Sequence, residues 1–189
     1  MAPRKTFAPS GILGTVWNLE EAGSIRLVAA TREVGISAVA AWTADDSSRL
    51  VEWAWSRLLR QHSEAFALVG AQGVPRALWC SRRDRLLALP CGPSYELGYL
   101  ELHPQDRGTL LGYYVLAVIA ARAIETGARG MVLASLPHPK VQAFYSFAGG
   151  KAGKVKGWQT PFGLVQYFFS EEALRALQQE LDAREARSL

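Results

Sequence analysis

The ten residues His103–Gly112, HPQDRGTLLG, constrain the fold of this 189-residue chain more than any other segment. They follow the apolar-rich run Tyr95–Leu102, which predicts a β-strand. They precede Tyr113–Glu125, whose apolar residues on nearly every side predict a buried helix. Met131–Leu136 predicts a second strand, and a strand–helix–strand crossover of this kind makes the two strands parallel. A helix start leaves backbone N–H groups free, so the turn is either a phosphate site or an ordinary glycine-containing connection.

The first half of the chain predicts short strands around one helix. Residues 1–12 contain prolines and a glycine and predict a flexible N-terminal arm, and residues 13–189 are expected to form a single domain. The expected elements are a hairpin of Thr15–Trp17 and Ile25–Ala29, a strand at Ile36–Trp42, an amphipathic helix at Ser47–His62, and a hairpin of Ala65–Gly70 and Pro75–Ser81.

The C-terminal part predicts a helix, a hairpin and a final helix. The helix is expected at His138–Phe147, and the runs Lys154–Trp158 and Leu164–Phe169 flank QTPFG as a hairpin would. Leucines at helical spacing predict a C-terminal helix over residues 171–187. Because strands alternate with helices in this half, the chain belongs to the α/β (α+β) class.

Composition argues against several classes of protein. The net charge is only +4, and basic residues gather only in short clusters, Arg82 to Arg85 and Lys151 to Lys156, so a nucleic-acid partner is not expected. No apolar run reaches the roughly 18 residues of a membrane helix, so a cytoplasmic protein is expected. Cys80 and Cys91 are eleven apart and the three histidines are isolated, a pattern without the spacing of a metal site.

The strand–turn–helix segment resembles the GNAT superfamily of acyl-CoA-dependent N-acyltransferases, best over residues 95–169. The family's usual junction reads HPxxRGxGxG. Here Arg107, Gly108 and Gly112 match, whereas Leu110 stands where the family nearly always has Gly or Ala. The resemblance implies that this turn binds the pyrophosphate of acetyl-CoA. The Leu110 side chain then either crowds the pyrophosphate or packs into the helix and leaves its N–H free. The cofactor-binding residues that the resemblance implies are Leu100, Leu102, Arg107, Gly108, Thr109, Leu110, Leu111, Gly112 and His138.

The same resemblance implies a fold and a catalytic acid. The fold is a mixed, mostly antiparallel central sheet with splayed parallel strands in the middle, flanked by helices. Family members often carry N-x-x-A-x-x-[FL]-Y after the next strand, and here Phe144 and Tyr145 match while His138 and Val141 replace Asn and Ala. The resemblance implies that Tyr145 protonates the departing thiolate, a role suited to a phenol. Aromatic packing is the alternative role for Tyr145.

Glu96 is the candidate general base. Transfer to an amine requires the neutral amine, and a carboxylate can take the proton, directly or through water. Glu101 and His103 are alternatives, and so is a merely solvated glutamate. Strict alternation places Glu96, Leu100 and Leu102 on one face and Glu101 and His103 on the other. A bulge, which the family commonly has in this strand, would change that assignment.

The resemblance therefore implies an N-acetyltransferase that carries an acetyl (acyl) group from acetyl-CoA to a primary amine by direct attack in a ternary complex. The acceptor is a small-molecule amine or a peptide or protein amine, and a homodimer is possible. The alternative is a GNAT-fold binding module with weakened or lost CoA binding, for which Leu110 and His138 speak. An unrelated basic α/β protein is the remaining alternative.

Overall fold

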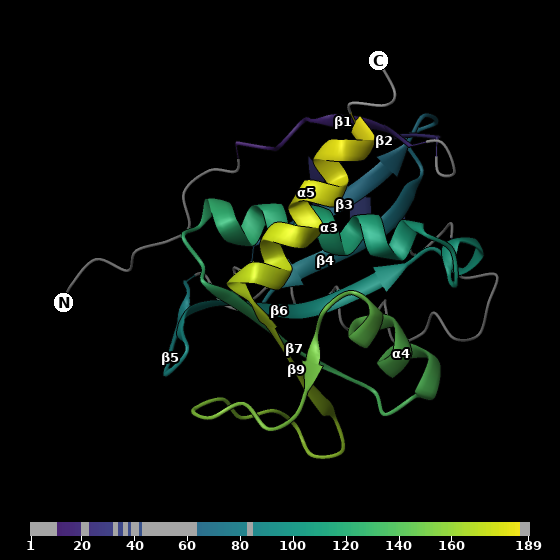
Figure 1. Cartoon of the computed structure of the whole chain (residues 1–189). Helices are drawn as coiled ribbons and strands as arrows, with labels where there is room; N and C mark the ends of the chain where they lie inside the picture. Colours follow the sequence, from purple (N-terminus) through teal and green to yellow (C-terminus); the bar gives the residue numbers. More distant parts are fainter. Residues whose placement is uncertain are drawn as a thin grey trace.

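The computed structural model describes residues 11–19, 23–31, 34, 35, 38, 42, 64–82 and 85–185. Within these residues the strands form a nine-stranded sheet in the order β1-β2-β3-β4-β6-β7-β9-β8, with β5 paired to β6 at its side (Figure 1). The strands are β1 (Val16–Leu19), β2 (Gly23–Ala29), β3 (Ala65–Gly70), β4 (Pro75–Ser81), β5 (Leu87–Leu89), β6 (Gly92–Leu102), β7 (Gly130–Ser135), β8 (Lys151–Ala152) and β9 (Val165–Ser170).

The pairing confirms the mixed, mostly antiparallel sheet. The β1–β2 and β3–β4 hairpins lie where the sequence predicts them, and each pairs antiparallel. Only β6 and β7 run parallel among the paired strands that the structure describes, joined by the crossover through helix α3 (Leu111–Glu125). Gly127 ends this crossover helix with a φ of 81°, a conformation that glycine adopts readily.

Helices cover one face of the sheet. This face carries apolar side chains, which must be buried against another element. Helix α3 and the C-terminal helix α5 (Glu171–Glu185) lie together on that face (Figure 1), and Leu174, Leu177 and Leu181 of α5 are buried in the main core. Helix α4 (Pro139–Phe147) adds Tyr145 to the same core. No helix within the described ranges is long and apolar enough to cross a membrane.

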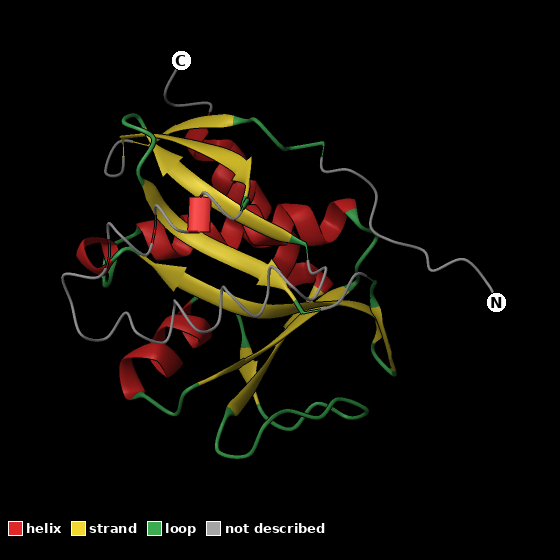
Figure 2. Ribbon diagram, turned by 180° about the vertical axis from the view of Figure 1, so that it is seen from behind, coloured by secondary structure: helices red, strands yellow, loops and turns green. Residues whose placement is uncertain are grey.

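The opposite face of the sheet, seen in Figure 2, carries a second cluster of buried side chains. Ala38 and Trp42 pack there against β3 and β4. The described residues Val34, Gly35, Ala38 and Trp42 have helical backbone, so the predicted strand at Ile36–Trp42 is wrong. A short apolar run fits a buried helix as well as a strand, and periodicity alone does not separate the two.

Three other predictions meet different outcomes. The strand predicted at Lys154–Trp158 is wrong, because the strand that pairs with β9 is Lys151–Ala152 and the chain from Lys154 to Trp158 is a turn and loop. The helix predicted at Ser47–His62 lies outside the described residues. So does most of the predicted arm, residues 1–10.

The strands β6 and β7 separate after a short paired segment. Their parallel pairing runs from Ser94 opposite Gly130 to Leu97 opposite Leu133 and then stops, although β6 continues to Leu102. Beyond Leu97 the β7-facing edge of β6 has no partner strand among the described residues. Backbone groups on such an edge are available to a ligand. The splay predicted for the two parallel strands is thereby confirmed.

Candidate functional site

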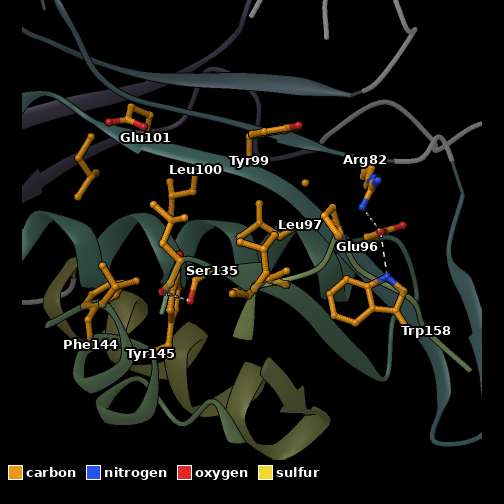
Figure 3. Close-up of a pocket in the computed structure, with 18 of the residues that line it drawn as sticks. Arg82, Glu96, Leu97, Tyr99, Leu100, Glu101, Ser135, Phe144, Tyr145 and Trp158 are labelled. Carbon is orange, nitrogen blue, oxygen red and sulfur yellow. Dashed lines mark hydrogen bonds and ion pairs between the residues drawn. The ribbon is translucent and has the colours of Figure 1, made fainter. Parts of the chain in front are cut away.

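A cavity of about 530 Å³ opens where β6 and β7 separate. Figure 3 shows Arg82, Glu96 and Trp158 at one end and Glu101, Phe144 and Tyr145 at the other. Its walls come from β6, the end of β7, helix α4 and the loop before β9. The predicted site residues that line it are Glu96, Leu100, Leu102, Arg107 and Tyr145.

A β-bulge at Gly98 determines which side chains of β6 face the cavity. Cys80 pairs with Tyr99 but the next residue of β4, Ser81, pairs with Leu97, so Gly98 is the extra residue. A Cβ on Gly98 would lie 3.0 Å from the backbone nitrogen of Arg82, which explains why this position is glycine.

The bulge overturns the predicted sharing of faces along β6. Tyr95 and Leu97 belong to the main core, and Leu100 and Leu102 pack against that same core. Glu96 therefore lies on the opposite face from Leu100 and Leu102. The prediction of a shared face is wrong, because the extra residue reverses the alternation after Gly98. The structure contains the bulge that the family resemblance had suggested for this strand.

Glu96 is a buried carboxylate held by two neighbours. Its side chain is only 1% exposed, yet it lines the cavity. Trp158 Nε1 donates a hydrogen bond to Glu96 Oε1 at 2.9 Å, and Arg82 Nη1 lies 3.7 Å from the same oxygen (Figure 3). The carboxylate is thus fixed in position at one end of the cavity.

Tyr145 lies at the other end of the cavity, on helix α4. Its ring centre lies 5.2 Å from that of Tyr167 and 5.2 Å from that of Phe144. Tyr145 therefore packs against aromatic neighbours and lines the cavity at the same time. Burial raises the pKa of Tyr145 above its usual range, and the nearby Tyr167 and Glu101 add to the rise. The phenol therefore keeps its proton at neutral pH. Its hydroxyl has no hydrogen-bond partner among the described residues.

The turn between β6 and α3 is built as an anion site would be. The 3₁₀ helix η2 (Pro104–Asp106) is followed by Gly108, which has a φ of 79°. Thr109 precedes the N-cap Leu110, and its hydroxyl donates to the Asp106 carbonyl at 2.7 Å and accepts from the Leu111 N–H at 3.2 Å. The N–H groups of Gly108, Leu110 and Gly112 have no acceptor within the described part of the chain. Free N–H groups at a helix start attract anions.

An ion pair anchors this turn to the sheet. Arg76 on β4 forms a bidentate pair with Asp106 of η2, and the backbone N–H of His103 donates to the Arg76 carbonyl at 2.8 Å. His103 Nδ1 accepts from the N–H of Gln105 at 3.2 Å, so its ring serves the turn. His103 does not line the cavity, which removes the geometric basis for His103 as base.

Arg107 is paired with Glu101 across the end of β6. Arg107 Nη2 donates to Glu101 Oε1 at 2.7 Å, and both side chains are partly exposed. Burial raises the pKa of Glu101, and the Arg107 guanidinium opposes that rise. Glu101 lines the same cavity as Glu96 and stays the second candidate base.

Leu110 is exposed. Its side chain is 42% accessible, its backbone is right-handed helical, and it occupies the position just before α3. Of the two alternatives open from the sequence, this exposure argues against packing into the helix, and crowding of the pyrophosphate stays a prediction. Gly112 does pack closely: a Cβ there would lie 3.2 Å from Leu102 Cδ1 and 3.3 Å from Phe144 Cζ. His138 is exposed at the start of α4 and does not line the cavity.

Arg82 also lines the cavity, although it was not among the residues predicted from the sequence. It is joined to Glu96 through a strand pairing that spans fourteen positions and depends on the bulge. The hydrogen bond from Trp158 joins residues 62 positions apart. The only signal for Arg82 was its membership of a short basic cluster, and nothing local indicated which of those arginines faces the cavity.

Solved structures share this architecture. The GNAT domain of PAT from S. lividans superposes with a TM-score of 0.66 at 18% identity, covering 86% of this chain and 99% of that one. The ribosomal-protein-S18-alanine N-acetyltransferase of Escherichia coli superposes with a TM-score of 0.58 at 12% identity, covering 77% of this chain and 93% of that one. A chimera built on the spermidine N-acetyltransferase of Vibrio cholerae superposes with a TM-score of 0.57 at 12% identity, covering 80% of this chain and 98% of that one. No protein-family model and no curated protein matches the sequence.

Proposed function

We propose that this chain, which has the fold of the GNAT acetyltransferases, transfers an acetyl (acyl) group from acetyl-CoA to a primary amine by direct attack in a ternary complex. One observation carries the proposal. A buried carboxylate, Glu96, and a protonated phenol, Tyr145, line a single cavity. Beside it lie a strand edge and a turn whose backbone N–H groups have no partner among the described residues. A base, an acid and an anion site are the parts that this transfer requires.

The residues present fit acetyl-CoA as a cosubstrate. The N–H groups of Gly108, Leu110 and Gly112 would receive the pyrophosphate, and Arg107 would add a positive charge. The unpaired edge of β6 near Leu100 and Leu102 would hold the pantetheine arm by backbone hydrogen bonds. Acetyl-CoA supplies the activated acetyl group, and His138 is left as a predicted contact outside the cavity lining.

The reaction requires a base at the amine and an acid at the thiolate, and Glu96 and Tyr145 take these two roles. Glu96 takes the proton that the amine loses as its nitrogen bonds to the carbonyl carbon. Tyr145 gives its proton to the thiolate as the carbon–sulfur bond breaks. Burial raises the pKa of Tyr145, so the phenol is protonated when this step begins. Both groups then return to their starting states by exchange with water. No covalent bond to the chain is needed, and Cys80, buried with a pKa raised to about 12, is a poor nucleophile.

Calorimetric titration of the purified protein with acetyl-CoA, and separately with CoA, tests the cosubstrate site. Micromolar binding with one site per chain is expected, followed by amine-dependent release of free CoA thiol. Absence of binding at millimolar acetyl-CoA would contradict the enzyme. It would favour the second candidate, a GNAT-fold binding module, which rests on the exposed Leu110 at the turn.

Leu110→Gly measures what the leucine does at this turn. Because the side chain is exposed and Leu110 is the N-cap of α3, where glycine is favoured over leucine, we expect the free energy of unfolding to change by less than about 1 kcal/mol. If the leucine crowds the pyrophosphate, the Kd for CoA is expected to fall about three- to tenfold when the side chain is removed. Thermal unfolding and calorimetry measure the two quantities. A less stable protein with unchanged Kd would show that Leu110 does not crowd the site.

A further inference from the structure

We infer that the acceptor is an amine that carries a carboxylate next to its amino group, an α-amino acid with an apolar side chain being the simplest example. This inference rests on the proposed function and names its substrate class. It is carried by the placement of Arg82 beside Glu96 at the end of the cavity away from the turn (Figure 3).

Arg82 is held in place by its backbone. Its N–H donates to the Glu96 carbonyl at 3.0 Å, and its Cα and Cβ lie against Gly98, where a side chain would clash. Its side chain is 48% exposed, and its guanidinium nitrogen Nη1 lies 3.7 Å from Glu96 Oε1, beyond hydrogen-bond distance. It makes no hydrogen bond with any residue in the described ranges. An arginine positioned this way offers N–H donors to a ligand.

The position of Arg82 argues against a role in binding phosphate groups of acetyl-CoA. Glu96 and Leu102 are six residues apart on β6, which is about 20 Å of extended strand. The anion turn and Arg107 follow Leu102, whereas Arg82 adjoins Glu96. The two arginines therefore mark opposite ends of the cavity, and Arg82 belongs to the end where the base meets the acceptor.

The charges at this end match one kind of amine. An α-amino acid carries a cation and an anion on adjacent groups, and the site presents an anion, Glu96, and a cation, Arg82, a few ångströms apart. The amino group can face Glu96 while the carboxylate pairs with the guanidinium. A polyamine would instead bring a second positive charge towards Arg82. A peptide N-terminus has no carboxylate at that position, so it gains nothing from Arg82.

Apolar side chains elsewhere in the same cavity select the rest of the acceptor. Trp158 packs in a cluster with Leu89 and Val132, which leaves its indole N–H for Glu96. Leu136, which is 62% exposed, and Pro161 both belong to the wall of this cavity. Binding is stabilised when apolar groups of a ligand cover apolar side chains that are exposed in a cavity. An acceptor with a leucine-like or phenylalanine-like side chain fits this wall.

The test compares acceptors that differ only in the carboxylate. L-Leucine is paired with L-leucinamide and 3-methylbutylamine, and L-phenylalanine with its amide and phenethylamine. Spermidine and an alanyl peptide complete the panel. Release of CoA thiol gives kcat/KM, and calorimetry on the CoA-loaded protein gives acceptor Kd without turnover. We expect the free acids to exceed the matched amines about 10- to 100-fold, the value of one charge-assisted ion pair.

Arg82→Gln is expected to remove that preference, leaving a ratio of acid to amine below about threefold while the Kd for acetyl-CoA stays unchanged. Arg82→Lys keeps the positive charge but lacks the planar set of N–H donors of a guanidinium, so it should retain part of the preference for the free acids. The matched control is Arg85→Gln, an exposed arginine three residues away that does not line the cavity, and it should keep the full preference. Thermal unfolding confirms that each variant is folded.

The outcomes separate the two proposals. Turnover of amines, spermidine or peptide as fast as the free acids, or no turnover of any free acid, would overturn the acceptor class while leaving acetyl-CoA binding intact. An unchanged ratio in Arg82→Gln would overturn the role of Arg82. Failure of acetyl-CoA to bind the wild-type protein would instead remove the proposed function, and the acceptor class with it.

Discussion

Glu96→Gln is expected to lower kcat for amine acetylation by about 100- to 10,000-fold at pH 7, the range of general base catalysis. Glutamine has the same shape, and its amide oxygen can still accept the hydrogen bond from Trp158 Nε1, but the amide cannot take up a proton. The Kd for acetyl-CoA should change less than about threefold, because Glu96 lies at the end of the cavity away from the turn. Steady-state kinetics and calorimetry separate the two effects.

The pH dependence of this defect distinguishes a lost base from a damaged site. An aliphatic ammonium has a pKa near ~10, so more of the acceptor is already neutral as the pH rises. The deficit of Glu96→Gln should therefore shrink towards pH 10. A deficit that is the same at every pH would point to a lost positioning contact. The matched variant is Glu101→Gln, and a larger loss of kcat there would transfer the role of base to Glu101.

Tyr145→Phe provides the contrasting profile. Its loss of kcat should not shrink at high pH, because the missing proton is needed by the thiolate and not by the amine. The raised pKa of Tyr145 means that the wild-type phenol stays protonated through neutral pH. Phenylalanine preserves the ring contacts with Tyr167 and Phe144, so the variant should remain folded.

The arrangement around the turn could be predicted from the sequence because it depends on local signals. The apolar strand, the glycine turn and the buried helix are contiguous, and each has a periodicity or a conformational requirement of its own. The parallel pairing of β6 with β7 followed from the crossover. The resemblance then implied the whole sheet, which the structure and its neighbours confirm.

The composition of the cavity could not be predicted because it depends on one extra residue and on distant partners. The bulge at Gly98 reversed the faces of β6. A glycine inside a strand such as YELGYLEL often marks a bulge, but the alternation of the strand does not show whether one is present. Trp158 reaches Glu96 across 62 positions, from a segment that resembled a strand and is a loop. Arg82 approaches only because Gly98 has no side chain. Tertiary contacts of this kind have no local pattern.

Arg107→Glu is expected to weaken CoA binding about 100-fold or more, because it places a negative charge where the free N–H groups and the helix dipole favour an anion. The new glutamate would also face Glu101, the present partner of Arg107 at 2.7 Å. That pair is partly exposed, so its loss should change the free energy of unfolding by about 1 kcal/mol at most. Calorimetry with CoA measures the Kd, and thermal unfolding measures stability.

Three controls assign the loss to the site. Arg85→Glu makes the same change of net charge at an exposed position outside the cavity and should leave the Kd within about twofold. Arg107→Gln removes the charge without reversing it and should give an intermediate Kd. Glu101→Gln releases Arg107 from its ion pair, so CoA should bind more tightly. Equal effects of Arg107→Glu and Arg85→Glu would show that the turn attracts CoA only through net charge, and the turn would then have no claim to be the pyrophosphate site.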